Sequence, residues 1–409
     1  MDLGVKPKER ARSGKMAIWS RVAHVASYPP RECGIATYTA DLVSSLSKEF
    51  PDQENIVIAV NDREAHYNYA EEVEFQIEQD NEATYAVAGD FVNRSGISLV
   101  SVQHEHGLFG GRDGDYILTF LTKVSVPVIT TLHTVHLEPT RHFKKVTSQV
   151  AAQSDSVVVL ARTARRILAD TYAVPGDKMR FIPHGAPKVS RRIGLRRATK
   201  RRLGLDGRRI LTTFGLINPD KGIEYVLEAL PEIVDTYPDV VYLVVGESHP
   251  QVRLRRGEGY RRKLLRMVSN LGLQRHVRFH NRFLPFEELI RYLLATDVYI
   301  IPYLNPNQIV SGTLAYAVAT GKAIVATPFL YAEEVLAEGR GILVDFRDPD
   351  GIAQAVLRLL SDRQLLLEMD RRAYDYGRKM TWPRVARKYQ KLFRRVLQRR
   401  SRRQPGSQQ

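Results

Sequence analysis

Residues 308–322, QIVSGTLAYAVATGK, contain a helix start that could bind an anionic group. The small residues Ser311, Gly312 and Thr313 precede an apolar helical run that ends at a glycine, and the stretch holds no carboxylate. A helix start exposes unpaired backbone N–H groups and a partial positive charge, which suit a phosphate. The alternative is that Ser311 only caps a buried helix. The stretch by itself is compatible with both readings.

Short apolar runs rich in β-branched residues alternate with helical patterns along the chain. Strands are expected at residues 21–27, 55–60, 98–102, 127–133, 156–160 and 179–183, and again at 209–215, 240–246, 276–280, 297–303, 323–327 and 341–346. Continuous apolar strands joined by crossovers are typical of parallel sheets that are buried on both faces. The sequence therefore predicts an α/β protein with two doubly wound, Rossmann-like domains.

A basic connector separates the two predicted domains, and an amphipathic helix follows them. The predicted boundaries are a disordered basic tail (1–15), an N-terminal Rossmann-like domain (16–187), a basic linker (188–208), a C-terminal Rossmann-like domain (209–383), a helix (384–400) and a disordered tail (401–409). Core packing on the N-terminal domain is the expected role of the helix's apolar stripe, with membrane docking as the alternative.

Composition and charge restrict the class of protein. The chain has 409 residues and is 44% hydrophobic, which is enough for two cores. Its net charge is +16, but the basic excess lies in the tails and the linker, so the rest of the chain is mildly acidic. This placement favours peripheral contact with an anionic surface over base recognition, and no nucleic acid partner is expected.

The location of the protein is predicted from its cysteine content and its apolar runs. Cys33 is the single cysteine, which fits a reducing compartment. The sequence has no apolar run of bilayer length and no pattern typical of a signal peptide. We expect a cytoplasmic protein that could contact the inner face of the membrane through its basic C-terminal segment.

Polar loops follow the predicted strands and are the expected ligand sites. In parallel sheets, ligands bind beyond the carboxyl ends of the strands, and with two such domains they bind in the cleft between them. The loops are YPPRECGIATYT, QHEHGLFGGRDG, HTVHLEP, GLINPDKG, GESHP and NPNQIVSGT. They hold most of the clustered histidines, glycines and isolated charges of the chain.

Three of these loops, with the elements that follow them, resemble glycosyltransferase family 4, the retaining enzymes of the GT-B fold. GIATYTADLVSSL resembles the family's Gly-rich loop and first helix, FGLINPDKGIEYVLEAL its donor-phosphate segment, and SGTLAYAVATGKAIVAT its donor-binding helix and next strand. The resemblance extends over about residues 20–395. It implies two Rossmann-like domains that face each other across a cleft, the N-terminal one binding the acceptor and the C-terminal one binding the donor. It also implies transfer of a hexose from a nucleotide sugar, UDP-glucose or GDP-mannose, to a hydroxyl acceptor, for which a carbohydrate is expected.

The chain departs from the family pattern at three positions. Two glutamates of the family fall at Gln308 and Tyr316, and an arginine of the family falls at Leu216, whereas Lys221 is retained. The second glutamate usually holds the nucleotide ribose. These departures leave two alternatives open: a retaining phosphorylase that uses a sugar phosphate, and a non-catalytic binder of sugars or nucleotides.

The implied reaction assigns catalytic roles to three residues. Negative charge that grows on a leaving phosphate needs neutralisation, which suits Lys221. Arg282 is the candidate substitute for the missing arginine, and the alternative is a surface ion pair with Glu287 or Glu288. His133 ends a predicted strand where the family usually has a histidine close to the donor sugar. Lys221, His133 and Arg282 are therefore the catalytic candidates.

The other candidate residues are expected to bind donor or acceptor. The donor set is Gly34, Gly215, Gln308, Ser311, Gly312, Thr313, Tyr316 and His249, of which His249 could instead be only exposed in a turn. The adjacent residues His104, Glu105 and His106 point in alternating directions and are a poor tetrahedral metal site, so we expect them to contact the acceptor. DGD at 113–115 and DPD at 348–350 are expected in turns. No metal and no cofactor are predicted.

Overall fold

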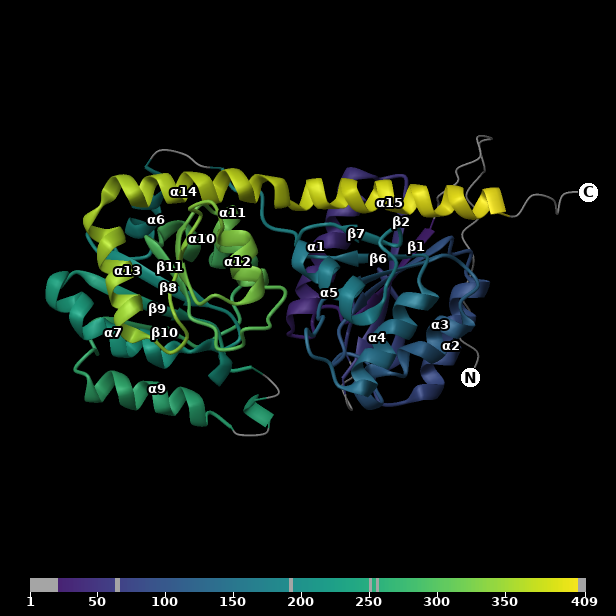
Figure 1. Ribbon diagram of the computed structural model, residues 1–409, viewed down its shortest axis with the longest axis horizontal. Helices are drawn as coiled ribbons and strands as arrows, with labels where there is room; N and C mark the ends of the chain where they lie inside the picture. The colour runs from purple at the N-terminus through teal and green to yellow at the C-terminus, as the bar shows by residue number, and fades with distance from the viewer. Residues whose placement is uncertain (1–20, 63–66, 191–193, 250–251, 255–256, 404–409) are drawn as a thin grey trace, which may run out of the picture.

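Two parallel sheets form the centres of two domains that lie side by side in the computed structural model (Figure 1). The structure describes residues 21–62, 67–190, 194–249, 252–254 and 257–403. Strands such as Val240–Val245 are buried along their whole length, because helices cover both faces of each sheet. The predicted pair of doubly wound, Rossmann-like domains is confirmed.

The first domain contains a seven-stranded sheet in the order β3-β2-β1-β4-β5-β6-β7, with every neighbouring pair parallel. Its strands are β1 (Arg21–Ala26), β2 (Glu54–Asn61), β3 (Val73–Glu78), β4 (Leu99–His104), β5 (Val128–Leu132), β6 (Ser156–Val159) and β7 (Met179–Phe181). Its helices are α1 (Gly34–Glu49), α2 (Glu82–Arg94), η1 (Arg112–Gly114), α3 (Ile117–Lys123), α4 (Arg141–Gln153) and α5 (Arg162–Tyr172). The edge strand β3 was not predicted, because its alternating charged residues lack the apolar run of the other strands.

The second domain contains a six-stranded parallel sheet in the order β10-β9-β8-β11-β12-β13. Its strands are β8 (Arg209–Phe214), β9 (Val240–Val245), β10 (Val277–His280), β11 (Val298–Ile301), β12 (Ala323–Ala326) and β13 (Ile342–Leu343). Its helices are η2 (Pro219–Lys221), α7 (Ile223–Thr236), α9 (Gly259–Asn270), α10 (Phe286–Ala295), α11 (Gly312–Ala319), α12 (Leu330–Leu336), α13 (Pro349–Ser361) and α14 (Arg363–Gly377). In both sheets the strand order reverses beside the first strand of the domain, which is where open α/β sheets bind ligands.

The basic connector contains a helix, α6 (Leu195–Arg202), that packs on the second domain. Lys200 Nζ donates to Asp297 Oδ2 at 2.5 Å, and Arg196 forms an ion pair with the buried Asp370. Part of the connector's positive charge is therefore neutralised by carboxylates of the second domain.

A long C-terminal helix, α15 (Trp382–Arg403), follows the short η3 (Arg378–Met380) and runs back along the first domain (Figure 1). Its apolar side chains pack against α1 and the sheet, and the hydroxyl of Tyr389 lies 3.0 Å from that of Tyr38 and 2.8 Å from Thr131 Oγ1. The apolar stripe is thus used inside the protein rather than for membrane docking.

The ends of α15 differ from the predicted bounds of 384–400. Residues 401–403, expected in a disordered tail, continue the helix, whereas 404–409 and the predicted tail 1–15 lie outside the described residues. None of the described helices is both long enough and apolar enough to span a bilayer. Contact between the basic face of α15 and an anionic membrane stays a prediction.

Candidate functional site

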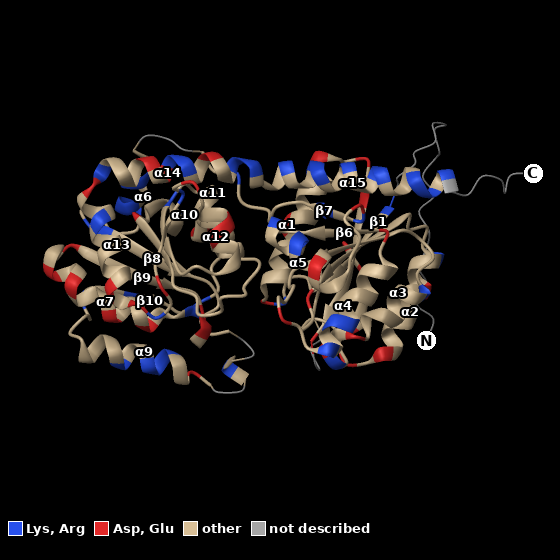
Figure 2. Cartoon of the chain, viewed as in Figure 1, with Lys and Arg blue, Asp and Glu red and all other residues tan. Residues whose placement is uncertain are grey.

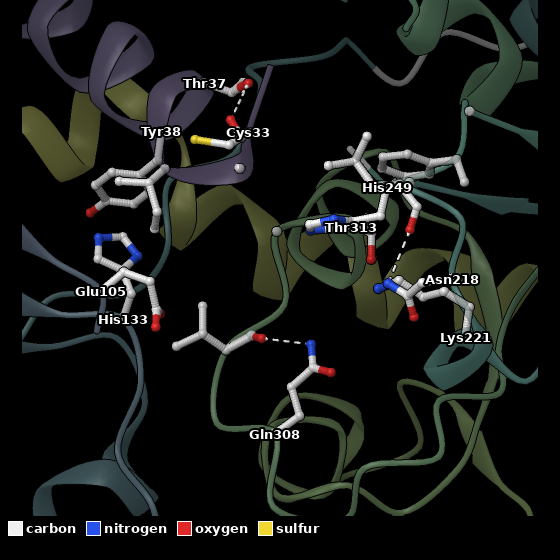
Figure 3. A pocket seen from close by; sticks show the side chains of 18 of the residues that line it. Cys33, Thr37, Tyr38, Glu105, His133, Asn218, Lys221, His249, Gln308 and Thr313 are labelled. Carbon is white, nitrogen blue, oxygen red and sulfur yellow. Dashed lines mark hydrogen bonds between the residues drawn. The ribbon is translucent and has the colours of Figure 1, made fainter. Parts of the chain in front are cut away.

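A pocket of about 790 Å³ lies between the two domains, where the loops at the carboxyl ends of their strands meet (Figure 3). The predicted site residues that line it are Gly34, Glu105, His133, Gly215, Lys221, His249, Gln308, Gly312, Thr313 and Tyr316. His104, His106, Ser311 and Arg282 are not among its lining residues. The topology thus brings most of the predicted residues together from loops far apart in the sequence.

On the second-domain wall, Lys221 lies near the start of α11. Its ammonium group is 3.6 Å from the centre of the Tyr303 ring, and the Tyr303 hydroxyl is 2.7 Å from Thr313 Oγ1. Gly222, with φ of 60°, lets the chain turn here, since a Cβ atom would lie 2.1 Å from the carbonyl oxygen of Pro302. Tyr303 therefore joins the cation to the helix start, and the two form one positively charged wall.

Ser311 caps α11 and does not face the pocket. Its Oγ accepts a hydrogen bond from the backbone N–H of Leu314 at 3.2 Å, and its side chain is buried. Ser311 therefore serves as the cap of α11, and it is not among the residues that line the pocket. Gly312 and Thr313 still line the pocket, and the first N–H groups of a helix have no partner within it.

On the first-domain wall, His133 is held in one orientation. Its Nε2 donates to Gln103 Oε1 at 3.1 Å, because a carboxamide oxygen can only accept, and this leaves Nδ1 as the acceptor. The Tyr38 ring packs against it in a T-shaped arrangement, with 4.7 Å between ring centres. Burial lowers the pKa of His133 to about 3, so the imidazole is neutral at pH 7 and serves as a hydrogen-bonding group.

Glu105 is the carboxylate of the first-domain wall that sequence analysis identified. It accepts a hydrogen bond from Thr134 Oγ1 at 2.5 Å, and burial raises its pKa. His136 and Glu138 also line the pocket and were not predicted, although both belong to the loop HTVHLEP. This wall offers carboxylate and imidazole acceptors for hydroxyl groups.

His104 and His106 lie behind the wall, so the structure does not bring these two predicted acceptor residues into the pocket beside Glu105. His104 is fully buried and stacks on Phe109, while His106 stacks on Phe143 and donates from Nδ1 to the carbonyl of Asp113 at 2.7 Å. Both side chains turn into the core, whereas Glu105 between them points to the pocket. Among the described residues, no group of three or more His, Cys, Asp or Glu side chains is arranged to hold a metal ion.

Arg282 lies outside the pocket, so the structure does not bring this catalytic candidate together with Lys221. Its guanidinium forms an ion pair with Glu288, and 55% of its side chain is exposed. The alternative reading, a surface ion pair, is what the structure contains. Leu216 lines the pocket at the position of the missing arginine. Among the described residues that line the pocket, Lys221 is the only lysine or arginine.

Tyr316 lines the pocket but directs its hydroxyl to the other domain. It donates to Asp41 Oδ2 at 2.8 Å, and Asp41 belongs to α1. Burial raises the pKa of Asp41, and the hydrogen bond from Tyr316 opposes this rise. Sequence analysis missed Asp41, because nothing in a helical run marks which carboxylate will meet a residue 275 positions away.

Gln308 and His249 lie on the second-domain side of the pocket (Figure 3). Gln308 donates from its side-chain amide to the carbonyl of Val310 at 2.9 Å, which orients the carboxamide. The backbone N–H of His249 donates to the carbonyl of Ile217 at 2.9 Å, and burial, then nearby Lys221, lowers the pKa of its imidazole. His249 is therefore a half-buried lining residue rather than a residue of an exposed turn.

His184 is a further lining residue that sequence analysis missed. Its Nδ1 donates to the carbonyl of Gly185 at 2.6 Å, and a Cβ on Gly312 would lie 3.2 Å from its Nε2. The signal was present, since His184 follows the predicted strand at 179–183. The His184 ring thus lies against the start of α11.

Acidification is expected to destabilise the protein because several histidines are buried in the neutral form. Burial lowers the pKa of His133 to about 3 and those of His24 and His184 to about 4, below the value of 6.5 for a free side chain. Their contribution is present above pH 6.5 and is lost as the pH falls toward these values. We expect each to cost about 2 kcal/mol at pH 5 relative to pH 7. Urea unfolding at the two pH values measures this, and equal stability would contradict it.

The comparisons with known proteins agree with this architecture. Residues 208–362 match the model of the family described as Glycosyl transferases group 1. The D-inositol 3-phosphate glycosyltransferase of Corynebacterium urealyticum is 28% identical over 60% of this chain and 58% of its own length. The GDP-mannose-dependent alpha-(1-6)-phosphatidylinositol monomannoside mannosyltransferase of Mycolicibacterium smegmatis is 29% identical over 52% of this chain and 55% of its own. The chain thus spans somewhat more than half the length of these relatives.

A solved structure extends the similarity of fold to nearly the whole chain. Anabaena Alr3699/HepE, crystallised in complex with UDP and glucose, superposes with a TM-score of 0.71 at 14% identity, covering 92% of this chain and 99% of that one. The predicted GT-B fold is confirmed. The protein therefore has the GT-B fold of known glycosyltransferases, and its second domain resembles the Glycosyl transferases group 1 family in sequence.

Proposed function

We propose that the protein is a retaining glycosyltransferase that moves a hexose from a nucleotide sugar to a hydroxyl acceptor. The observation that carries the proposal is the pocket itself, in which Lys221 and the start of α11 lie on one domain and His133 and Glu105 on the other. A cation and free N–H groups suit a diphosphate, and a carboxylate with neutral imidazoles suits sugar hydroxyls. The two walls would thus hold the two substrates face to face.

The proposed chemistry needs no protein nucleophile. The bond between the anomeric carbon and the phosphate oxygen breaks while a bond to the acceptor oxygen forms on the same face of the sugar. The acceptor proton passes to the departing phosphate oxygen. Lys221 and the N–H groups of Gly312 and Thr313 would stabilise the negative charge that grows on the diphosphate. The missing glutamates at Gln308 and Tyr316 are therefore compatible with activity.

The donor is proposed to be UDP-glucose or GDP-mannose. The name of one relative specifies GDP-mannose, and Alr3699/HepE was crystallised with UDP and glucose. The names of the two relatives specify inositol-containing acceptors, which supports a polyhydroxylated acceptor beside Glu105. Incubation with a panel of nucleotide sugars and such acceptors should release a nucleoside diphosphate. Turnover with a sugar phosphate in place of the nucleotide sugar would indicate a phosphorylase. Binding of the nucleotide sugar without any turnover would indicate a non-catalytic relative.

Glu105→Gln should impair use of the acceptor more than use of the donor. The substitution keeps an oxygen for Thr134 but removes the charge that would accept a hydrogen bond from the acceptor hydroxyl. We expect kcat/KM for the acceptor to fall by about 10- to 100-fold, the range for a hydrogen bond to a charged group. Steady-state kinetics with each substrate varied in turn measures the effect. A change confined to the KM for the donor would contradict the placement of Glu105 beside the acceptor.

Gln308→Glu should weaken donor binding by about 1 kcal/mol or more, since it adds a negative charge to a wall that would hold phosphates. Leu216→Arg should restore part of the loss, because both positions line the same pocket. Calorimetric titration of the nucleoside diphosphate into single and double variants gives the coupling. Strictly additive effects would mean that the two positions do not share a phosphate site.

A further inference from the structure

We propose that a second, smaller cavity binds a phosphate group at the junction of the two domains. This junction cavity, of about 190 Å³, is formed by the connector, the end of α14, η3 and the start of α15. Its cationic lining residues are Lys188, Arg378, Arg384 and Arg387. It lies apart from the interdomain pocket, with which it shares no lining residue among those described.

The charge of the junction cavity is not balanced by its own walls. No described lining residue is an aspartate or a glutamate. The side chains of Lys188 and Arg384 take part in none of the hydrogen bonds or ion pairs between described residues. Arg387 lies 3.3 Å from Glu49 Oε2, and Arg378 donates to the Tyr374 hydroxyl at 3.3 Å. Two of the four cations are therefore available to an anion, and the other two carry further N–H donors.

A larger basic cavity on the second domain shows the contrast. That cavity, of about 1000 Å³, is lined by aspartates as well as by lysines and arginines. Several of its cations are already in ion pairs, such as Lys200 with Asp297 and Arg209 with Asp239. An anion would compete there with carboxylates that are already in place, whereas in the junction cavity it would meet Lys188 and Arg384, which have no ion-pair partner among the described residues.

The size of the junction cavity favours a small anion. Pockets for drug-sized ligands measure about 300 Å³ or more, so this cavity suits a phosphate or pyrophosphate group rather than a whole nucleotide. Its wall also has apolar parts and two hydroxyl groups, and the arginines and the lysine are its charged groups; the apolar residues are Pro187, Val189, Ala319 and Pro383, and the hydroxyls belong to Tyr374 and Thr381. Arginine and lysine are the residues that recognise phosphate through charge-assisted hydrogen bonds.

The backbone of the junction is already in place without a ligand. The N–H of Ala186 donates to the carbonyl of Met380 at 2.8 Å, and the N–H of Trp382 donates to that of Ala186 at 3.0 Å. The Tyr374 hydroxyl donates to the carbonyl of Val189 at 2.9 Å. These bonds fix residues 186–189 beside η3 and α15, so binding would order side chains there but not backbone. Figure 2 shows Lys and Arg recurring along α15 and at its meeting with α14.

The test is calorimetric titration of pyrophosphate at constant ionic strength, in a Lys221→Ala background that weakens binding in the interdomain pocket. Lys188→Gln with Arg384→Gln should weaken pyrophosphate binding by about tenfold or more. The matched control, Lys391→Gln with Arg399→Gln, removes the same charge from exposed positions of α15 outside the cavity and should change binding by less than about twofold. Equal weakening by both pairs would mean a diffuse attraction and would overturn the proposal.

A second measurement on the unmodified chain needs no variant to fold. Pyrophosphate should slow the acetylation of Lys188 by acetic anhydride, followed by mass spectrometry, while sodium chloride at the same ionic strength should not. Lys391 serves as the internal reference because it is exposed and lies outside the cavity. Equal protection of both lysines, or of neither, would overturn the assignment of the site.

Discussion

Lys221→Ala should lower kcat, because it should raise the activation free energy by about 2 to 4 kcal/mol. This is the range for removal of one preorganised donor to a developing negative charge. Lys221 is the fixed cation among the described residues of the interdomain pocket, and Tyr303 holds its ammonium group beside the start of α11. Leu216 offers no charge that could replace it. Steady-state release of the nucleoside diphosphate, with the donor saturating, measures the effect on kcat.

Arg282→Ala is the matched control for this prediction. It also removes one positive charge from the second domain, but its guanidinium is paired with Glu288 at the surface. Exposed ion pairs contribute little, so we expect kcat to stay within about twofold and the Tm to change little. If well-folded Lys221→Ala turned over as fast as Arg282→Ala, Lys221 would not stabilise the leaving group.

Tyr316→Phe should shift the protein toward an open arrangement of its domains. The substitution removes the hydrogen bond from the Tyr316 hydroxyl on α11 to the partly buried carboxylate of Asp41 on α1. A hydrogen bond to a charged group contributes about 1.5 to 3 kcal/mol, and its loss leaves a carboxylate without this donor. The closure equilibrium should therefore change by about 10- to 150-fold. Small-angle X-ray scattering should report a larger radius of gyration.

Two further variants separate this contact from a general effect of losing a hydroxyl. Tyr225→Phe is the control, because the Tyr225 side chain forms no hydrogen bond with another described residue. Asp41→Asn combined with Tyr316→Phe should show less than the sum of the single effects, since both remove the same contact. An unchanged radius of gyration in Tyr316→Phe would show that other contacts hold the domains together.

The pattern of apolar runs accounts for most of the fold. A strand buried on both faces, such as β9, needs an unbroken run of large apolar residues, and that run is visible in one sequence window. The edge strand β3 has one fully buried side chain and is held mainly by pairing with β2, so its local pattern carries little signal. Local hydrophobicity thus reveals the strands at the centre of a sheet better than those at its edge.

The same contrast applies to the pocket. Because the strands are parallel, their carboxyl ends meet at one edge, and this rule alone placed Glu105, His133 and Lys221 near each other. Sequence by itself determined which loops face the cleft. The rotation of each side chain there depends on contacts with distant residues. His104 and His106 therefore turn into the core, Arg282 pairs at the surface, and Tyr316 reaches Asp41, as only the tertiary structure could decide.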